Sequence, residues 1–231
     1  MSVVIGWVAK ILDIFFPPTE RALRARSVSY EQLAAAVSPI LLAYTDPPAI
    51  SLLPYRSHLV QAVITEAKFH DAHHAQNVLG RILAEYLGTR LTERPALNSA
   101  NDAVVLLPVP LSRARVRERG YNQAERICQA ACQYLTVQSK TDAEVAGIAF
   151  CVDATLLERI RDTQPQTQLG GRARRTNLQG AFQTARPADA YTLYIVVDDV
   201  VTTGATLSTT ITTLQAAGAA NILPIALAHS P

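Results

Sequence analysis

The spacing of apolar and polar residues predicts a helical first part of the chain. Apolar side chains recur at the spacing of an amphipathic helix in several stretches. Pro17 and Pro18 end the first of these helices, and no such period is present between residues 38 and 57. Helices are therefore predicted at 5–16, 31–37, 59–67 and 75–91, with irregular chain at 38–57.

The pattern changes from residue 103 onward. Continuous apolar runs, typical of parallel strands buried on both faces, now alternate with helical stretches. Strands are predicted at 103–109, 147–152, 191–197 and 222–228, and helices at 122–135 and 205–217. This alternation predicts an α/β fold with a doubly wound, mostly parallel sheet. We expect a helical or irregular extension over residues 1–57 and an α/β domain over 58–231.

Composition narrows the function classes. Hydrophobic residues make up 49% of the chain and the net charge is +2, so a large core is available and neither global disorder nor a polyanion-coating protein is indicated. Of the 21 basic residues only Lys10, Lys68 and Lys140 are lysines. The arginine excess suits phosphate binding, because guanidinium groups match phosphate oxygens in pairs.

The cysteines and the apolar segments suggest a cellular location. Cys128, Cys132 and Cys151 have neither disulfide nor zinc-ribbon spacing, which favours a reducing compartment. The stretch from Val3 to Phe16 is too short and too charged to span a membrane. We therefore expect a cytoplasmic protein with no membrane span.

An acidic pair carries the clearest candidate chemistry. Asp198 and Asp199 directly follow the predicted strand 191–197, and a loop of sequence Thr-Thr-Gly-Ala-Thr then opens a helix. Ligands of parallel sheets bind beyond the carboxyl ends of the strands, and a helix N-terminus attracts anions. Carboxylates for hydroxyls or a hydrated cation, beside donors for a phosphate, indicate a sugar-phosphate site. We accordingly expect both carboxylates to be largely unpaired by basic side chains in the free protein.

The acidic pair has three alternative interpretations. A Walker B element would require a Gly-x-x-x-x-Gly-Lys-Ser/Thr loop, which the chain lacks. A haloacid-dehalogenase nucleophile requires a different spacing of the acids. A purely structural strand end is the remaining alternative.

The stretch 196–206 resembles the signature with which type I phosphoribosyltransferases bind phosphoribosyl pyrophosphate (PRPP). The resemblance implies a sheet of the type I phosphoribosyltransferase kind. It also implies that Asp198 and Asp199 are the catalytic pair, contact the ribose hydroxyls and bind Mg²⁺ together with the ligand. The implied 5′-phosphate loop consists of Thr202, Thr203, Gly204, Ala205 and Thr206.

An arginine-rich segment follows the strand predicted at 103–109. Arginines stand at every second position from 113 to 119, so in an extended loop they would share one side. A solvated surface is the simpler interpretation of such a run, and a pyrophosphate loop is the functional one. Its candidate residues are Arg117, Arg119, Gly120 and Asn122.

Three motifs in order resemble the ComF family, which includes the GntX-like proteins. These are Pro108-Val109-Pro110-Leu111 leading to Arg119-Gly120-Tyr121-Asn122-Gln123, the segment 166–182, and the acidic pair with its loop. A weaker match lies upstream, around residues 55 to 69. Further candidates follow from these matches: Lys68, Gln166, Arg174 and Asn177.

The resemblance implies PRPP-dependent glycosyl transfer with Mg²⁺ as cofactor, and a link to natural competence and DNA uptake. Single-stranded DNA and the competence helicase machinery are the macromolecular partners that it implies. The alternative is a PRPP- or nucleotide-sensing, single-stranded-DNA-binding uptake factor without catalysis. The sequence identifies neither the acceptor nor the oligomeric state.

One departure from the family concerns zinc. Many ComF-family proteins carry a cysteine-rich zinc element after an N-terminal Phe-Pro segment, whereas here Phe16-Pro17 precedes no cysteine before Cys128. We therefore expect no zinc. His70, His73 and His74 have a spacing that could ligate a metal, or that marks an exposed helix start.

Overall fold

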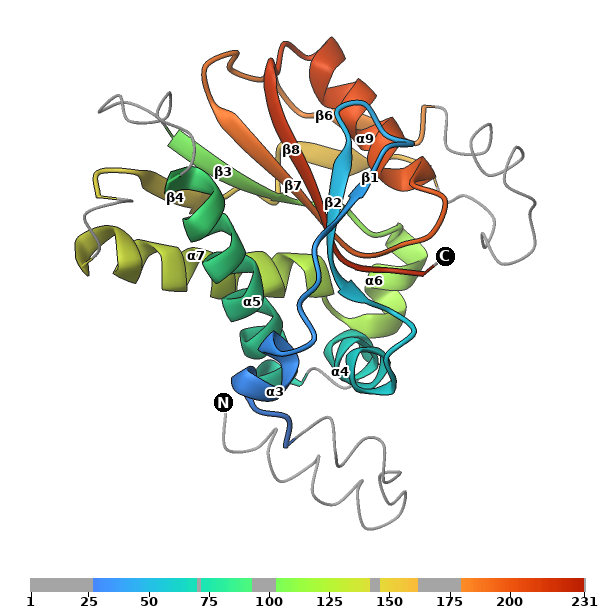
Figure 1. Ribbon diagram of the computed structural model, residues 1–231. Helices are drawn as coiled ribbons and strands as arrows, with labels where there is room; N and C mark the ends of the chain where they lie inside the picture. The colour runs from blue at the N-terminus through green and yellow to red at the C-terminus, as the bar shows by residue number, and fades with distance from the viewer. Residues whose placement is uncertain (1–26, 70–71, 93–102, 142–145, 162–179, 231) are drawn as a thin grey trace.

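Six strands form the central sheet, in the order β1-β2-β8-β7-β3-β4 (Figure 1). The computed structural model describes residues 27–69, 72–92, 103–141, 146–161 and 180–230. The strands are β1 (Ile40–Leu42), β2 (Ala49–Pro54), β3 (Ala103–Pro108), β4 (Ala149–Val152), β7 (Leu193–Val201) and β8 (Asn221–His229). Only the β1–β2 pair is antiparallel, so the sheet is mixed and mostly parallel.

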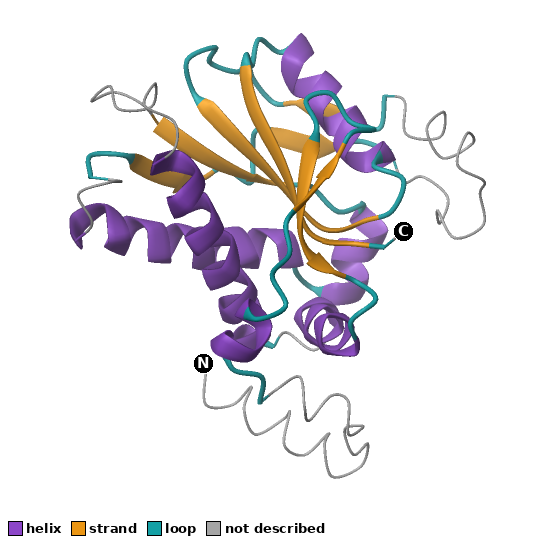
Figure 2. Cartoon of the chain, in the orientation of Figure 1, coloured by secondary structure: helices purple, strands orange, loops and turns teal. Residues whose placement is uncertain are grey.

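Helices cover both faces of this sheet (Figure 2). They are α3 (Tyr30–Ala34), α4 (His58–Phe69), α5 (His73–Thr92), α6 (Arg113–Arg119), α7 (Gln123–Thr141) and α9 (Ala205–Ala216). A small antiparallel pair, β5 (Leu157–Arg159) and β6 (Phe182–Thr184), lies beside α9. The fold is α/β, as predicted, and is compatible with a doubly wound sheet.

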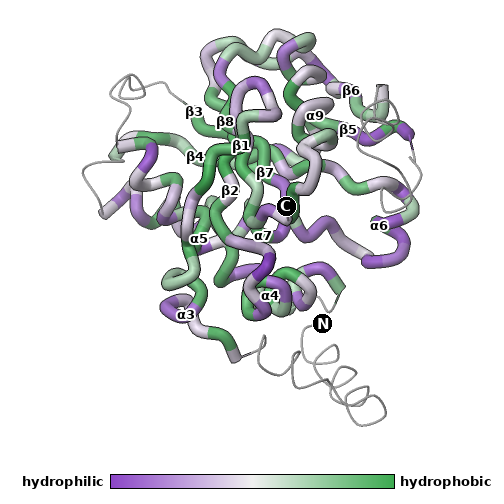
Figure 3. Tube along the Cα trace, turned by 45° about the vertical axis from the view of Figure 1, so that its right-hand side comes forward, coloured by the Kyte–Doolittle hydropathy of each residue, from purple (hydrophilic) through white to green (hydrophobic). Residues whose placement is uncertain are grey.

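Two apolar clusters form the core, one on each face. Helices α4, α5 and α7 pack on one face against Ile195 and Val197, while α9 and β6 pack on the other against Tyr194 and Val196. Because alternate residues of β7 point to opposite faces, a strand buried on both sides must be apolar throughout. Figure 3 shows this as hydrophobic colour along the central strands.

The chain reverses its direction across the sheet between β3 and β7. From β3 it passes through α6 and α7 to the outer strand β4, and from β7 it passes through α9 to β8 on the opposite side. Right-handed crossovers that move in opposite directions place their helices on opposite faces, as α7 and α9 are. The carboxyl ends of β3 and β7 therefore meet at a topological switch point, where ligands of such sheets bind.

The elements predicted from residue 58 onward are confirmed wherever the structure describes them, with shifted ends. The prediction of irregular chain at 38–57 is wrong, because β1 and β2 lie there. Strand β2 pairs in parallel with β8, so the sheet includes residues on both sides of the boundary expected after residue 57. The helix predicted at 5–16 lies outside the described residues.

Close packing of α5 on α7 generates a test of the fold. A Cβ atom added at Gly80 would lie 2.5 Å from the Ala130 Cβ and 3.0 Å from the Ile127 carbonyl oxygen. We expect Gly80→Ala to lower the free energy of unfolding by about 1–3 kcal/mol, the usual cost of overpacking. Chemical denaturation measures this change.

Gly88→Ala on the same helix is the matched control. The nearest atom to its added Cβ would be the Gln138 Oε1 at 3.5 Å, an ordinary contact. Alanine is the better helix former by up to about 1 kcal/mol, so this variant should be unchanged or more stable. Equal destabilisation of both variants would contradict the α5–α7 contact.

Candidate functional site

The acidic pair lies within β7 rather than beyond its end. Pairing between β3 and β7 stops at Pro108 and Val197, with one more hydrogen bond of 2.9 Å from the Val109 N–H to the Val197 carbonyl. Strand β7 continues beside β8 as far as Val201. Asp198 and Asp199 therefore occupy the positions where β3 has left β7 and the sheet opens.

Asp199 is buried and held by two other elements. Its Oδ1 lies 3.0 Å from the Nζ of Lys68 at the end of α4, and its Oδ2 accepts a hydrogen bond from the Nε2 of Gln123 at the start of α7. The expectation that both carboxylates are unpaired by basic side chains is thus wrong for Asp199. A carboxylate so far from solvent requires a counter-charge, and Lys68 provides it.

Asp198 differs from its neighbour. Its half-buried carboxylate accepts a hydrogen bond of 2.9 Å from the Asp199 N–H. Burial and the adjacent Asp199 charge raise the pKa of Asp198 well above its ordinary value, although Lys68 and Arg115 act in the opposite direction. The negative charge of Asp198 is therefore poorly compensated in the free protein, and a cation or hydroxyl ligand would stabilise it.

The arginine-rich segment is the helix α6, not an extended loop. Residues two apart on a helix do not share a face, so the predicted alignment of its arginines on one side is wrong. Arg113, Arg115 and Arg117 are exposed. Gly120 ends the helix with φ of 80°, a left-handed conformation that glycine adopts without strain.

Arg119 turns inward toward the acidic pair. Its guanidinium stacks over Phe69 at 4.7 Å and its Nη1 donates a 2.8 Å hydrogen bond to the Oε1 of Gln123. Its buried Nε has no hydrogen-bond partner. Burial lowers the pKa of Arg119, and the charge of Asp199 opposes this shift.

Gln123 links the arginine segment to the acids, and sequence reasoning missed it as a site residue. One amide group accepts from Arg119 and donates to Asp199, a combination that neither a carboxylate nor an ammonium provides. The available signal was its place directly after Gly120-Tyr121-Asn122. The Asn122 side chain itself caps α7, with bonds of 3.1 Å from the Ala124 N–H and 3.0 Å to the Val109 carbonyl.

The predicted phosphate loop connects β7 to α9. Thr202, Thr203 and Gly204 form the connection, and Ala205 and Thr206 begin the helix. Gly204 has φ of 71° and caps α9 without a side-chain hydrogen bond, and the N-terminus of a helix attracts anions. The loop and the acidic pair are thus consecutive on one strand–helix connection.

Three of the predicted site residues, Gln166, Arg174 and Asn177, lie outside the described residues. Among the residues that are described, no group of three or more His, Cys, Asp or Glu side chains is placed to hold a metal ion. His74 lies 2.7 Å from the Val28 carbonyl oxygen through its Nε2 and so serves a structural contact. The carboxylates of the acidic pair are oxygen ligands of the kind that Mg²⁺ prefers, and the poorly compensated charge of Asp198 fits a cation.

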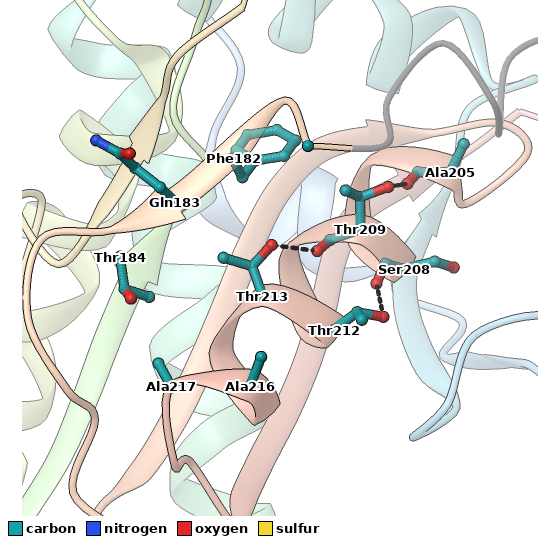
Figure 4. A pocket seen from close by; sticks show the side chains of 11 residues that line it. Phe182, Gln183, Thr184, Ala205, Ser208, Thr209, Thr212, Thr213, Ala216 and Ala217 are labelled. Carbon is teal, nitrogen blue, oxygen red and sulfur yellow. Dashed lines mark hydrogen bonds between the residues drawn. The ribbon is translucent and has the colours of Figure 1, made fainter.

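A pocket of about 650 Å³ lies between α9 and β6, beside the site (Figure 4). Its wall includes Ala205, the hydroxyls of α9 and Phe182. Thr209 and Thr213 donate their hydroxyl hydrogens at 2.8 Å to carbonyls one turn earlier, so they offer only acceptor lone pairs to the pocket. The acidic pair does not line it.

The fold and the site together define an α/β protein. Its candidate site, at the switch point of the sheet, consists of two carboxylates followed by a loop of the kind that binds anions. Competence protein F of Haemophilus influenzae is 30% identical over 148 residues, which cover 63% of this chain and 57% of that protein. DNA utilization protein YhgH of Escherichia coli O157:H7 is 31% identical over 161 residues, covering 69% of this chain and 63% of that protein. YhgH of Salmonella typhi is 33% identical over 117 residues, or 51% of this chain and 45% of that protein.

These proteins are homologues of the chain, which confirms the predicted relationship to the ComF family. The chain matches less than two thirds of the length of each of these relatives. No family model matches the sequence. Within the described part of the chain, no helix has the length and apolar character needed to cross a membrane.

The unequal surroundings of the two acids lead to opposite predictions for their neutral variants. Asp198→Asn removes a poorly compensated charge while keeping the size of the side chain, so it should be as stable as the parent or more stable by up to about 1 kcal/mol. Asp199→Asn leaves the Lys68 ammonium unpaired and should cost about 1–3 kcal/mol. Thermal and chemical unfolding of both variants measure the difference, and the same sign for both would refute the asymmetry.

Proposed function

We propose that this chain is a Mg²⁺-dependent PRPP-binding protein of the phosphoribosyltransferase kind that serves DNA uptake. The observation that carries the proposal is the placement of the acidic pair and an anion loop in succession at the switch point. A sugar phosphate presents hydroxyls and a phosphate together, and this connection offers acceptors and donors in the same order. The names competence protein F and DNA utilization protein support the link to DNA uptake.

The remaining side chains of the site suit the pyrophosphate of PRPP. Arg119 has an unpartnered Nε and Lys68 lies beside Asp199, so positive charge borders the carboxylates on the side of α4 and α6. An anion of high charge would gain from both groups, since charge-assisted hydrogen bonds are about twice as strong as neutral ones. In this proposal Asp198 accepts hydrogen bonds from the ribose hydroxyls while Asp199 orients Lys68 and Gln123.

Catalysis, where it occurs, would depend on positioning and charge stabilisation. Bound Mg²⁺ would supply charge neutralisation for the pyrophosphate as it leaves the ribose. Asp198 would hold the ribose, the 202–206 loop would hold the 5′-phosphate, and Arg119 would stabilise the departing oxygens.

Calorimetry with PRPP tests the proposal. We expect binding that requires Mg²⁺, and a loss of at least about tenfold in affinity, or 1.4 kcal/mol, for Asp198→Asn. Glu158→Gln on β5 removes an exposed carboxylate outside the site and should leave the affinity unchanged. Equal binding with and without Mg²⁺, or none at millimolar PRPP, would rule the proposal out.

A second candidate is an uptake factor that binds single-stranded DNA without catalysis. The exposed arginines of α6 and the 53%-exposed ring of Phe69 favour it, since backbone contacts and stacked bases both stabilise bound single strands. Replacing Arg113, Arg115 and Arg117 together by Ala should lower the DNA affinity and reduce the slope of its salt dependence by about 2. Arg90→Ala on α5 is the charge control, and an unchanged slope in the triple variant would exclude α6 as the DNA surface.

A further inference from the structure

Tyr44 is placed on the 202–206 loop by a turn that the sequence gave no reason to include in the site. The turn joins β1 to β2 and is closed by the buried hydroxyl of Thr45. This hydroxyl donates to the Pro47 carbonyl at 2.9 Å and accepts from the Ala49 N–H at 2.7 Å. The same Oγ1 lies 3.4 Å from the Leu42 carbonyl oxygen at the end of β1, so this hydroxyl contacts both ends of the turn and ties the position of Tyr44 to the sheet.

The ring of Tyr44 fills the space beside Gly204. A Cβ atom at Gly204 would lie 2.3 Å from the Tyr44 Cε2, 2.5 Å from its Cδ2 and 3.2 Å from the Thr45 Cγ2. Only glycine accepts both this contact and the left-handed φ of 71°. The ring therefore restricts the path of the backbone at the start of α9.

The hydroxyl of Tyr44 contacts the same loop one peptide earlier. It donates to the Thr202 carbonyl oxygen over a long 3.3 Å. In a planar trans peptide the carbonyl and the following N–H point in opposite directions. The N–H of Thr203 consequently points away from the Tyr44 hydroxyl.

We infer that Tyr44 is a positioning residue for the phosphate-binding loop, acting through the backbone of residues 202–204; this inference rests on the proposed function. The ring contributes more than the hydroxyl, because its contacts with Gly204 are close whereas the hydrogen bond is long. Preorganisation of this kind raises affinity by lowering the ordering cost of binding. The group it serves is a phosphate monoester, the chemistry of a sugar 5′-phosphate.

If Tyr44 only stabilised the fold, replacing it would weaken the binding of every ligand to a similar extent. The test therefore compares ligands that use different parts of the site. Ribose 5-phosphate requires the loop, inorganic pyrophosphate requires the basic side, and PRPP requires both. Tyr44→Ala should weaken ribose 5-phosphate and PRPP by about tenfold and leave pyrophosphate within about twofold, because only the loop loses its support. Tyr44→Phe keeps the ring and should bind all three within about twofold of the parent.

Calorimetry with the three ligands and melting curves of each variant complete the experiment. Tyr44→Leu, which keeps an apolar side chain in the turn, replaces the alanine variant should that variant fail to fold. Unchanged ribose 5-phosphate affinity, or an equal loss for pyrophosphate, would overturn the inference. A parent protein that binds ribose 5-phosphate but not PRPP would refute the proposed function while still testing Tyr44, and a parent that binds neither would overturn both.

Discussion

The buried ion pair between Asp199 and Lys68 is the interaction on which the site depends. Removing both charges from water costs several kcal/mol, and their attraction compensates for this only when further hydrogen bonds complete the geometry. Gln123 supplies one such bond, and the Val200 N–H supplies another at 2.5 Å. Asp199 thereby joins β7 to α4 and α7, which the topology brings to one edge of the sheet from distant parts of the chain.

The ion pair with Lys68 gives Asp199 a different role from its neighbour Asp198, although the two side chains are chemically identical. A carboxylate with both oxygens occupied gains little from a ligand, whereas a poorly compensated one gains much. Asp198 is therefore the group that a cation or a sugar hydroxyl would stabilise, and its unfavourable environment in the free protein is the kind of strain that functional sites retain. Lys68 has a second consequence, because it brings a positive charge next to the acids and makes the site suitable for a ligand with both hydroxyls and phosphates.

Strands that are buried on both faces were predictable because they must be apolar throughout. β3 follows this rule, as do residues 193–197 of β7 and 222–228 of β8, so these strands were predicted. The acidic pair was predicted directly after the strand, whereas it lies within β7. β2 obeys the same rule, but prolines at 47, 48 and 54 suggested irregular chain, and no local pattern shows that its partner is β8. Gln123 and Lys68 acquire their roles only through contacts with Asp199, 76 and about 130 positions away along the chain, which periodicity does not reveal.

The turn between β1 and β2 also belongs to the candidate site only because of a contact between distant parts of the chain. Strand β8, the parallel partner of β2, is the last strand in the chain. β2 therefore gains this partner only after the rest of the sheet has been formed. The turn before β2 then lies beside the loop between β7 and α9, where Tyr44 meets a carbonyl 158 residues away. Without β2 beside β8, neither Tyr44 nor Thr45 would have a fixed position over Gly204. The pairing of β2 with β8 therefore completes the sheet and also places Tyr44 and Thr45 beside the 202–206 loop.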